Sequence, residues 1–381
     1  MHIFVTKREL LRLFQHCKNV VDPKCTMPVL LNSLIECEDD STIRVSATDM
    51  HTSLSGTTEA TIEEPGSAAV DTRLFCDAVK AMPEGSLSVR TRVAGSTMEL
   101  TSEDSRRRYE IPCISSDSFP MLPVPASDCN LLDLDVEVLE RFIAQTLFSI
   151  SEDLSRDVLC TALLEVKDEC VCMVTADRHR LSKSSHMCRT LANMTMLIPR
   201  KTVLTLRGLA EEAMSASRGT NGGSVKIEHS GSHGFFTFDT IRLASTLVDG
   251  TFPPYQSVFG SARTGTVIIP QRKELMRAIK GVALVASKRS NGVKLKIRSD
   301  VMEIESESTE SGRAYDEVAV DYDGEPVTLG VCAPYMLDVM GVMRCDSVSM
   351  LLGGEVDPIV MRPTDDTEAE EFTSILMPMR I

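Results

Sequence analysis

The side chains best placed to do chemistry are three cations on one expected helix. Between residues 266 and 289, Lys273, Arg277 and Lys280 recur at helical spacing and therefore share one face. The opposite face is apolar and carries Leu275, Ile279, Val282 and Ala286. A row of cations suits the phosphates of a nucleic acid backbone, because binding them needs charge and no base sequence. The alternative is an ordinary solvated helix face, since helices tolerate lysine and arginine well.

A catalytic centre has little support in the sequence. Asp177, His179 and a nearby cysteine could be combined into a nucleophile system. The seven histidines are scattered, however, and no GxSxG, Walker or HExxH spacing occurs. Cys170 and Cys172 would share one face of a strand, but no second pair or histidine cluster accompanies them. We therefore expect a protein that is not an enzyme and that uses no cofactor and no metal.

The composition describes an acidic protein of several domains whose helices are basic. A length of 381 residues allows two to three domains, each with a full core. Aromatic residues make up only 4%, so leucine, valine, isoleucine and methionine must fill those cores. The formal net charge is −15, but positive charge is concentrated in the expected helices and the remainder is acidic.

The sequence shows no sign of a membrane or secreted protein. No apolar run approaches the ~18 residues that a membrane span needs. The N-terminus lacks the basic and then apolar pattern of a signal peptide. Twelve cysteines without a secretion signal fit a reducing compartment. We expect a cytoplasmic protein with no membrane partner.

A short apolar strand followed by an amphipathic helix recurs along the chain. His2–Val5 is such a strand, and Thr6 with Glu9 three residues later forms a capping-box pattern. The helix that follows is expected to bury Leu10, Phe14 and Cys17 and to expose Lys7, Arg8, Arg12 and Lys18. Counting the later copies, helices are expected over about residues 6–21, 71–83, 135–150, 199–214, 270–289 and 333–344.

Six strand–helix–strands units predict an α+β fold, with helices on one face of antiparallel sheets. Their spacing predicts three tandem domains of one kind, each a duplicated unit, over residues 1–126, 127–260 and 261–381. Expected strands of the first domain include Val29–Cys37 and Leu54–Ile62. Ser115–Ser127 and Asp249–Thr264 share a Phe-Pro motif and are expected to be linkers. If sheets joined edge to edge between domains, the helices would fall on one side of a curved surface.

Short motifs along the whole chain resemble those of the bacterial sliding clamp family, the beta subunits of DNA polymerase III. They are Thr26–Leu30, Ala47–Asp49, Asp177–Leu181, Pro199–Lys201, Leu247–Pro253 and Met377–Ile381. Each motif is weak alone. Their order and spacing, together with the threefold repeat, carry the resemblance.

The resemblance implies a DNA polymerase processivity factor for DNA replication. In that family a homodimer of three-domain DNA-clamp chains closes head to tail into a ring, of which each chain forms half. The ring encircles and slides on double-stranded DNA, with helices lining the hole. It would tether the DNA polymerase III core, and an ATP-driven clamp loader would open it. Other polymerases and repair proteins would bind through a short clamp-binding motif.

The resemblance and the helix pattern together nominate the cations that face DNA. The expected DNA-facing residues are Lys7, Arg8, Arg12, Lys24, Arg73, Arg200, Lys201, Lys273, Arg277 and Lys280. For each of them the alternative is a solvated charge without a role in binding.

The resemblance places the joint between subunits at two apolar spots. Leu284 and Val285 would meet Tyr109 and Ile111 on a strand of the next subunit. Arg106 and Arg108 flank that strand and would face acidic residues across the joint. The alternative is that Leu284 packs on its own sheet.

The resemblance also implies a partner-peptide pocket between the second and third domains. Carried over position by position, its wall comprises Leu159, His179, Arg180, Leu181, Pro253, Val258, Tyr335, Val356, Met377, Pro378, Met379 and Arg380. A mostly apolar wall with a few polar groups suits a short peptide. Arg178, Ser257 and Cys332 stand where the family often has Gly, Arg and Asn, which leaves the preferred motif open. For His179 the alternative is a satisfied polar residue at a strand end. For the whole protein it is a repeat scaffold that binds only proteins.

Overall fold

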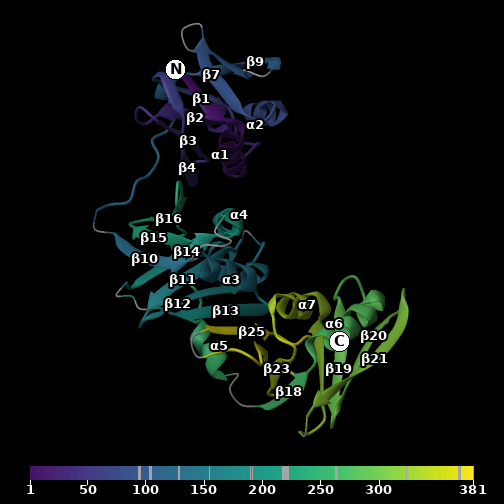
Figure 1. Ribbon diagram of the computed structural model, residues 1–381. Helices are drawn as coiled ribbons and strands as arrows, with labels where there is room; N and C mark the ends of the chain where they lie inside the picture. Colours follow the sequence, from purple (N-terminus) through teal and green to yellow (C-terminus); the bar gives the residue numbers. More distant parts are fainter. Residues whose placement is uncertain are drawn as a thin grey trace. The chain divides into compact units, whose positions relative to one another are not determined.

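The described chain forms two compact units, each built on one antiparallel sheet (Figure 1). The computed structural model describes residues 1–92, 96–102, 105–127, 129–153, 155–188, 190, 192–216, 223–261, 265–322, 324–367 and 370–380. Met1–Glu137 and Leu204–Leu247 form the first unit, and Val138–Val203 and Val248–Ile381 form the second. Within the described ranges, every helix is too short or too polar to cross a membrane.

The first unit contains a 13-stranded sheet in the order β10-β15-β16-β17-β4-β3-β2-β6-β9-β8-β7-β1-β5. The strands are β1 His2–Thr6, β2 Asn32–Cys37, β3 Thr42–Thr48, β4 Thr52–Glu59, β5 Thr61–Glu64, β6 Ser67–Asp71, β7 Ser86–Arg92, β8 Thr97–Ser102, β9 Ser105–Ile114, β10 Asn130–Asp135, β15 Ser224–Ser230, β16 His233–Phe238 and β17 Ile241–Thr246. Helices α1 (Lys7–Val20) and α2 (Thr72–Ala81) pack against each other, and α1 lies against β3 and β4.

The second unit contains a 12-stranded sheet in the order β14-β11-β12-β13-β25-β24-β23-β18-β21-β20-β19-β22. The strands are β11 Thr161–Lys167, β12 Cys170–Ala176, β13 Arg180–Met187, β14 Met194–Pro199, β18 Thr266–Pro270, β19 Gly292–Arg298, β20 Val301–Ser308, β21 Gly312–Asp321, β22 Val327–Cys332, β23 Val348–Leu352, β24 Ile359–Pro363 and β25 Glu370–Leu376. The remaining helices of the chain are α3 Val136–Thr146, α4 Arg200–Ala216, α5 Tyr255–Ser261, α6 Arg272–Val282 and α7 Ala333–Val342.

All six expected helices form, and each follows a short strand. At the first of them the Thr6 hydroxyl accepts the backbone N–H of Glu9 at 3.4 Å, as the capping-box pattern predicts. The Glu9 carboxylate does not complete the reciprocal bond and instead accepts from Arg12 at 2.9 Å. Both sheets also run edge to edge through strands far apart in sequence, since β17 pairs with β4 and β13 pairs with β25.

Several expected boundaries are wrong, and tertiary contacts or local chemistry explain them. The helix expected over 270–289 ends at Val282, next to the poor helix former Gly281, and a 3-10 turn follows. The linker expected over 249–264 contains α5, since Pro254 can precede a helix start. Residues 28–31 form a 3-10 helix before β2, and the strand expected over 54–62 divides into β4 and β5.

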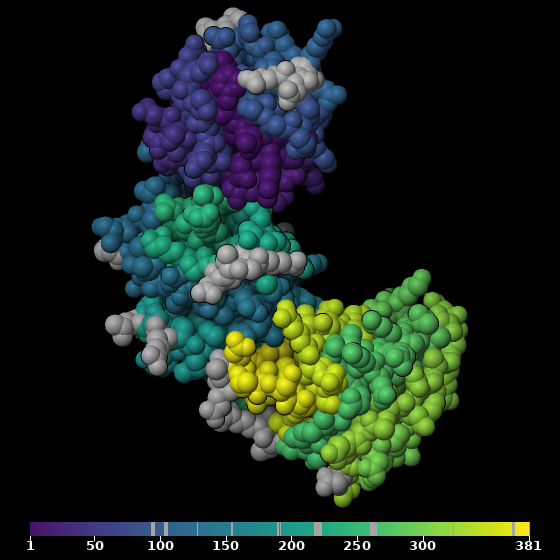
Figure 2. Space-filling view, viewed as in Figure 1, coloured from purple at the N-terminus to yellow at the C-terminus, as the bar shows by residue number. Residues whose placement is uncertain are grey.

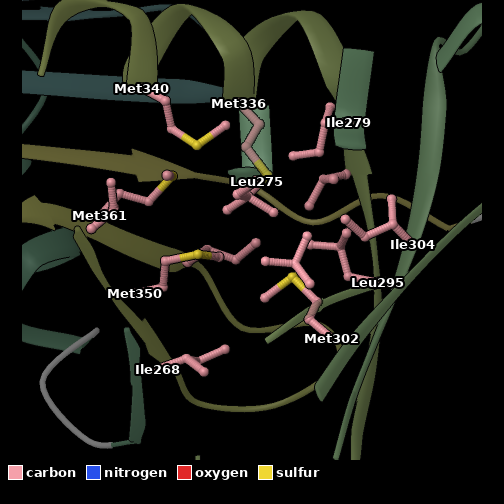
Figure 3. Close-up of a cluster of buried hydrophobic side chains, with 14 of the residues drawn as sticks. Ile268, Leu275, Ile279, Leu295, Met302, Ile304, Met336, Met340, Met350 and Met361 are labelled. Carbon is pink, nitrogen blue, oxygen red and sulfur yellow. The ribbon is translucent and has the colours of Figure 1, made fainter. Parts of the chain in front are cut away.

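Methionine fills much of the core beneath α6 and α7, as the shortage of aromatic residues predicts. Figure 3 shows Met302, Met336, Met340, Met350 and Met361 meeting between the two helices and the sheet. All five are fully buried. Their unbranched side chains fill irregular gaps that stiffer residues would leave open. This core fixes which face of α6 is left for solvent.

Candidate functional sites

The cationic row on α6 is exposed, as the helical spacing predicts. Lys273, Arg277 and Lys280 are exposed. The opposite face buries Leu275, Ala278, Ile279 and Val282 in the core. Within the described part of the chain none of the three cations forms an ion pair. Their charges are therefore available to a ligand.

Arg272 fixes the start of α6 to the end of α7. Its Nε donates to the Cys345 carbonyl at 2.7 Å, and its Nη1 donates to the Met340 carbonyl at 3.0 Å. The carbonyls in the last turn of a helix lack intrahelical donors, so this guanidinium supplies a cap. The contact holds the cationic row in one orientation relative to the core.

The other expected DNA-facing cations divide by exposure. Arg8, Lys24 and Arg73 are exposed and form no ion pair within the described ranges, and Lys201 is also exposed. Arg200 is half-buried and pairs with Glu152 at 2.8 Å.

Two cations of α1 are committed to contacts inside the first unit. The Lys7 ammonium bonds Glu84 at 2.8 Å and its side chain is only 11% exposed, so its expected exposure is wrong. Helical spacing does not reveal that the turn after α2 covers this position. Arg12 donates to Glu9, to Glu212 at 3.3 Å and to the Thr240 hydroxyl at 3.2 Å. Neither side chain is free to bind phosphate without losing these partners.

Leu284 projects into solvent, as expected. It is 83% exposed and lies in the 3-10 turn that follows α6. The alternative that it packs on its own sheet is therefore wrong. Val285 beside it is half-buried.

The strand expected to receive Leu284 is β9. Arg106 and Arg108 are exposed and Tyr109 is half-buried, but Ile111 is only 4% exposed. Ile111 stands opposite Met98 of β8 and points into its own core, so it cannot present an apolar surface to a partner. Alternation along β9 decides this, because side chains two residues apart share a face.

Two long strands keep an unpaired edge within the described residues. β9 pairs with β8 along its length but with β6 only at Cys113 and Ile114. β21 pairs with β20 along its length but with β18 only at Val320 and Asp321. Such edges offer unpaired backbone groups to another strand.

The expected peptide site is built around a turn at the start of β13. The Asp177 carboxylate accepts the backbone N–H groups of His179 at 2.7 Å and Arg180 at 2.9 Å. The Asp177 N–H donates to the Arg180 carbonyl at 3.0 Å, which closes the turn. The Met377 N–H donates to the His179 carbonyl at 2.8 Å. The structure thus brings the C-terminal segment beside His179, and Figure 2 shows that segment in yellow at the surface next to teal residues of the second unit.

Arg180 lies between two rings and two carboxylates. Its guanidinium carbon is 4.2 Å from the centre of the Tyr335 ring and 5.3 Å from that of Phe148. Its nitrogens reach Asp177 at 3.0 Å and Asp338 at 2.6 Å. The imidazole of His179 also stacks on the Tyr335 ring, with ring centres 5.9 Å apart. Burial raises the pKa of the Tyr335 phenol, so this ring stays neutral.

An apolar cluster adjoins this polar group. Leu159, Leu181 and Val258, all expected in the pocket wall, pack together with Phe252 and Tyr255. The Tyr255 hydroxyl donates to Glu165 at 2.7 Å, and burial raises its pKa. Burial also raises the pKa of the Cys172 thiol in this cluster to about 11. The cluster is therefore uncharged apart from Glu165 at its margin.

The remaining wall residues lie around these two groups with varied exposure. Met377 is 44% and Val356 is 70% exposed, and Pro253 and Arg380 are exposed. Pro378 and Met379 are half-buried, and the Met379 N–H donates to the Gly330 carbonyl at 2.9 Å.

The three departures from the family pattern have separate surroundings. Arg178 is exposed and pairs with Asp153 at 3.3 Å. The Ser257 hydroxyl donates to the Pro254 carbonyl at 2.7 Å, inside its own turn. Cys332 precedes α7, and burial raises the pKa of its thiol.

Sequence reasoning missed Asp338 and Phe148, which contact Arg180, and Phe252 and Tyr255, which complete the apolar cluster. Asp338 and Phe148 hold Arg180 in place, yet one lies on α7 and the other lies just after α3. Nothing in their local spacing points to an arginine so distant in sequence.

Models of three parts of one protein family match the chain in order. The N-terminal, central and C-terminal domains of the DNA polymerase III beta subunit match residues 1–123, 133–254 and 258–380. The chain belongs to the DNA polymerase III beta subunit family. Its fold is therefore that of three tandem α+β clamp domains, with helices on antiparallel sheets.

Individual members of the family are similar to this chain over its full length. The "Beta sliding clamp" of Caulobacter vibrioides is 27% identical, with 100% of each chain covered. A crystal structure of the DNA polymerase sliding clamp from Pseudomonas aeruginosa is 26% identical with a TM-score of 0.90, and a sliding clamp from Bartonella birtlesii bound to griselimycin is 27% identical with a TM-score of 0.90. Each likeness extends over 100% of this chain and 100% of the solved chain.

Proposed function

We propose that this protein is a homodimeric sliding clamp that gives a DNA polymerase its processivity during replication. Membership of the beta subunit family and the full-length likeness to sliding clamps carry the proposal. The exposed row on α6 supports it, because loose, sequence-independent phosphate contacts centre a duplex while still allowing it to slide. The net charge of −15 disfavours DNA elsewhere on the chain.

The proposed partners are double-stranded DNA, the DNA polymerase III core, and other polymerases and repair proteins that carry a short clamp-binding motif. The motif would bind at the His179–Tyr335 stack and the neighbouring apolar cluster. A weak peptide contact suffices once the ring holds both proteins on one DNA, because tethering raises the effective concentration. An ATP-driven clamp loader would open the ring. We further propose domain boundaries near residues 126 and 260 and a cytoplasmic location.

The proposed ring closes through the unpaired strand edges. The β9 edge carries Arg106, Arg107 and Arg108 against Glu110 and is positive, although Arg108 already pairs with Glu99 and Glu110. Exposed Asp316 and Glu317 give the β21 edge a negative charge. Two antiparallel strands of opposite charge can add to each other's sheets, with the charges fixing the register. A head-to-tail contact of this kind closes when two subunits complete the circle. Leu284 would supply an apolar contact beside this joint.

The proposed clamp performs no catalysis. Asp177 is the carboxylate that could orient His179 as a base, but its oxygens already accept two backbone N–H groups and the Arg180 Nε. His179 stacks on Tyr335 instead. Substitution of His179 should therefore change partner binding only.

The cationic row provides the direct test. The triple variant Lys273→Glu, Arg277→Glu and Lys280→Glu should lose polymerase processivity and retention on DNA. The slope of log affinity against log salt should fall by up to about 3, since each phosphate contact contributes about 0.9. The matched control reverses three exposed cations on strands, Lys167→Glu, Arg298→Glu and Arg362→Glu, and should keep both properties. A scaffold that binds only proteins would function equally with either variant, which would refute the proposal.

A further inference from the structure

The turn that frames the peptide site occurs a second time in the first unit. The Asp49 carboxylate accepts the N–H groups of His51 at 2.9 Å and Thr52 at 2.6 Å, and the Asp49 N–H donates to the Thr52 carbonyl at 3.1 Å. The Thr246 N–H donates to the His51 carbonyl at 2.7 Å. Each bond has its counterpart around Asp177, with Met377 in the place of Thr246. We call the turn Asp49–Thr52 with its surroundings the first frame, and the turn Asp177–Arg180 with its surroundings the second frame.

The apolar support of the two frames also corresponds position by position. In the first frame Leu34 stands opposite Ala69, and in the second Leu163 stands opposite Leu197. A 3-10 helix, Pro28–Leu31, precedes β2 in the first frame, and another, Asp157–Cys160, precedes β11 in the second frame. The first cluster is completed by Phe119, Val29 and Leu122, and the second contains Phe252, Val158 and Tyr255 in the matching places. The two frames are therefore copies of one architecture.

The floor of the first frame differs because it is polar. Ser46 stands opposite Leu34 where Val174 stands opposite Leu163, and Ser53 occupies the place of Leu181. Ser46 is only 2% exposed, and its hydroxyl has no hydrogen-bond partner within the described residues. A buried hydroxyl without a partner costs free energy that a bound polar group would recover.

A cleft opens over this floor, beneath the segment that follows β9. It has a volume of about 690 Å³, and its lining includes Ser46, Ser55, Thr57 and Arg242. A smaller cleft of about 230 Å³ lies at Met50 and His51, and residues 120–123 line both. On that segment Met121 is 97% and Val124 is 76% exposed. Hydroxyl groups on the floor and bare apolar side chains at the rim suit an extended peptide better than a compact apolar molecule.

The charge of the larger cleft selects the peptide. Three carboxylates line it, from Glu36, Asp117 and Asp239, against the guanidinium groups of Arg44 and Arg242. Arg44 is already paired with Glu38 outside the lining. Glu36 and Asp239 form no ion pair within the described ranges. The cleft therefore carries uncompensated negative charge.

We propose that the first frame is a second peptide-binding site, which takes an extended, basic segment of a partner protein. A lysine or arginine of the segment pairs with Glu36 or Asp239, a polar group bonds the Ser46 hydroxyl, and an apolar residue covers Met121. The site shares with the proposed function only the assumption that the second frame takes a peptide.

Selection of random heptapeptides displayed on phage, against the full-length protein, tests the site. We expect one class of enriched peptides that carries lysine or arginine and is unaffected by Tyr335→Ala, which alters the second frame. The double variant Glu36→Lys with Asp239→Lys should abolish binding of a fluorescent copy of such a peptide. Ser46→Val, which installs the residue type of the second frame, should weaken binding by about tenfold. The matched control Asp40→Lys with Glu59→Lys, exposed carboxylates outside the cleft, should leave binding unchanged.

The results separate the two sites. Enrichment only of peptides that lose binding with Tyr335→Ala would overturn the second site while supporting the proposed function. A basic class whose affinity is the same for the double variant and the matched control would overturn it as well. If the selection enriched the basic class but no peptide whose binding depends on Tyr335, the result would count against the proposed function and not against the first frame.

Discussion

Removal of the Arg180 guanidinium should selectively destabilise the second unit. The side chain is 11% exposed, stacks on Tyr335 and Phe148, and bonds Asp177 and Asp338. Breaking a buried ion pair by removing one partner costs roughly 3–5 kcal/mol. We expect Arg180→Ala to cost about 3 kcal/mol, at the lower end of that range. Asp338 is 44% exposed, and Asp177 keeps its two backbone donors, so neither carboxylate is left bare.

A conservative variant and a neighbouring arginine sharpen this prediction. Arg180→Lys keeps the charge but loses the planar stack, and should cost about 1–2 kcal/mol. Arg178 lies on the same turn as Arg180 and forms an exposed ion pair with Asp153. Arg178→Ala removes that pair and should cost less than about 1 kcal/mol. Native-state hydrogen exchange at the amides of α7 and β13 measures these free energies locally, which matters because a chain of several domains need not unfold in one step. Costs for Arg180→Ala and Arg178→Ala within about 0.5 kcal/mol of each other would refute the reasoning.

Three further predictions concern the joint, pH and the core. Leu284→Asp should convert the proposed dimer to a monomer in sedimentation velocity. Leu74→Asp, which changes an exposed leucine on α2, should not. A dimer unchanged by Leu284→Asp would show that Leu284 does not contribute to the joint. His16 Nε2 lies 2.6 Å from the Glu212 carboxylate, and this contact, with that of Arg12, lowers the pKa of Glu212 below its ordinary 4.5. The resulting stabilisation is present above that value and lost as pH falls through the folded-state pKa. Glu212→Gln should therefore lose less stability in urea unfolding between about pH 5 and 3 than the parent, and equal losses would contradict this. Met336→Ala should cost about 2–5 kcal/mol in urea unfolding, because the side chain is fully buried, and a cost below about 1 kcal/mol would show that the core collapses to fill the space.

The sequence predicts the parts of the fold that depend on local periodicity. The start of α1 at Thr6 and the apolar face of α6 follow from residue spacing over one or two turns, and both are found as expected. The end of α6 and the existence of α5 are missed, because a helix boundary depends on what packs around it. Exposure is likewise decided by neighbours, as Lys7 shows, since the turn after α2 covers it.

The candidate sites are only partly readable from the sequence for a related reason. The cations of α6 lie close together in the chain, so their common face can be predicted. By contrast, two partners of Arg180, Asp338 and Phe148, are distant from it in sequence and lie beside it only in the folded chain. The repeated Asp-x-His turns at Asp49 and Asp177 are visible in the sequence, but their shared hydrogen-bond pattern becomes evident only with the strand register.

Encirclement of DNA is tested most directly by retention on DNA of different topology. The protein would be loaded by a clamp loader and ATP onto a singly nicked circular plasmid, and gel filtration would measure the bound fraction before and after the plasmid is cut once. A ring that slides predicts retention on the circle and release from the linear DNA, because a sliding ring leaves through a free end. Equal retention on circular and linear DNA would contradict encirclement and would reduce the interaction to ordinary binding.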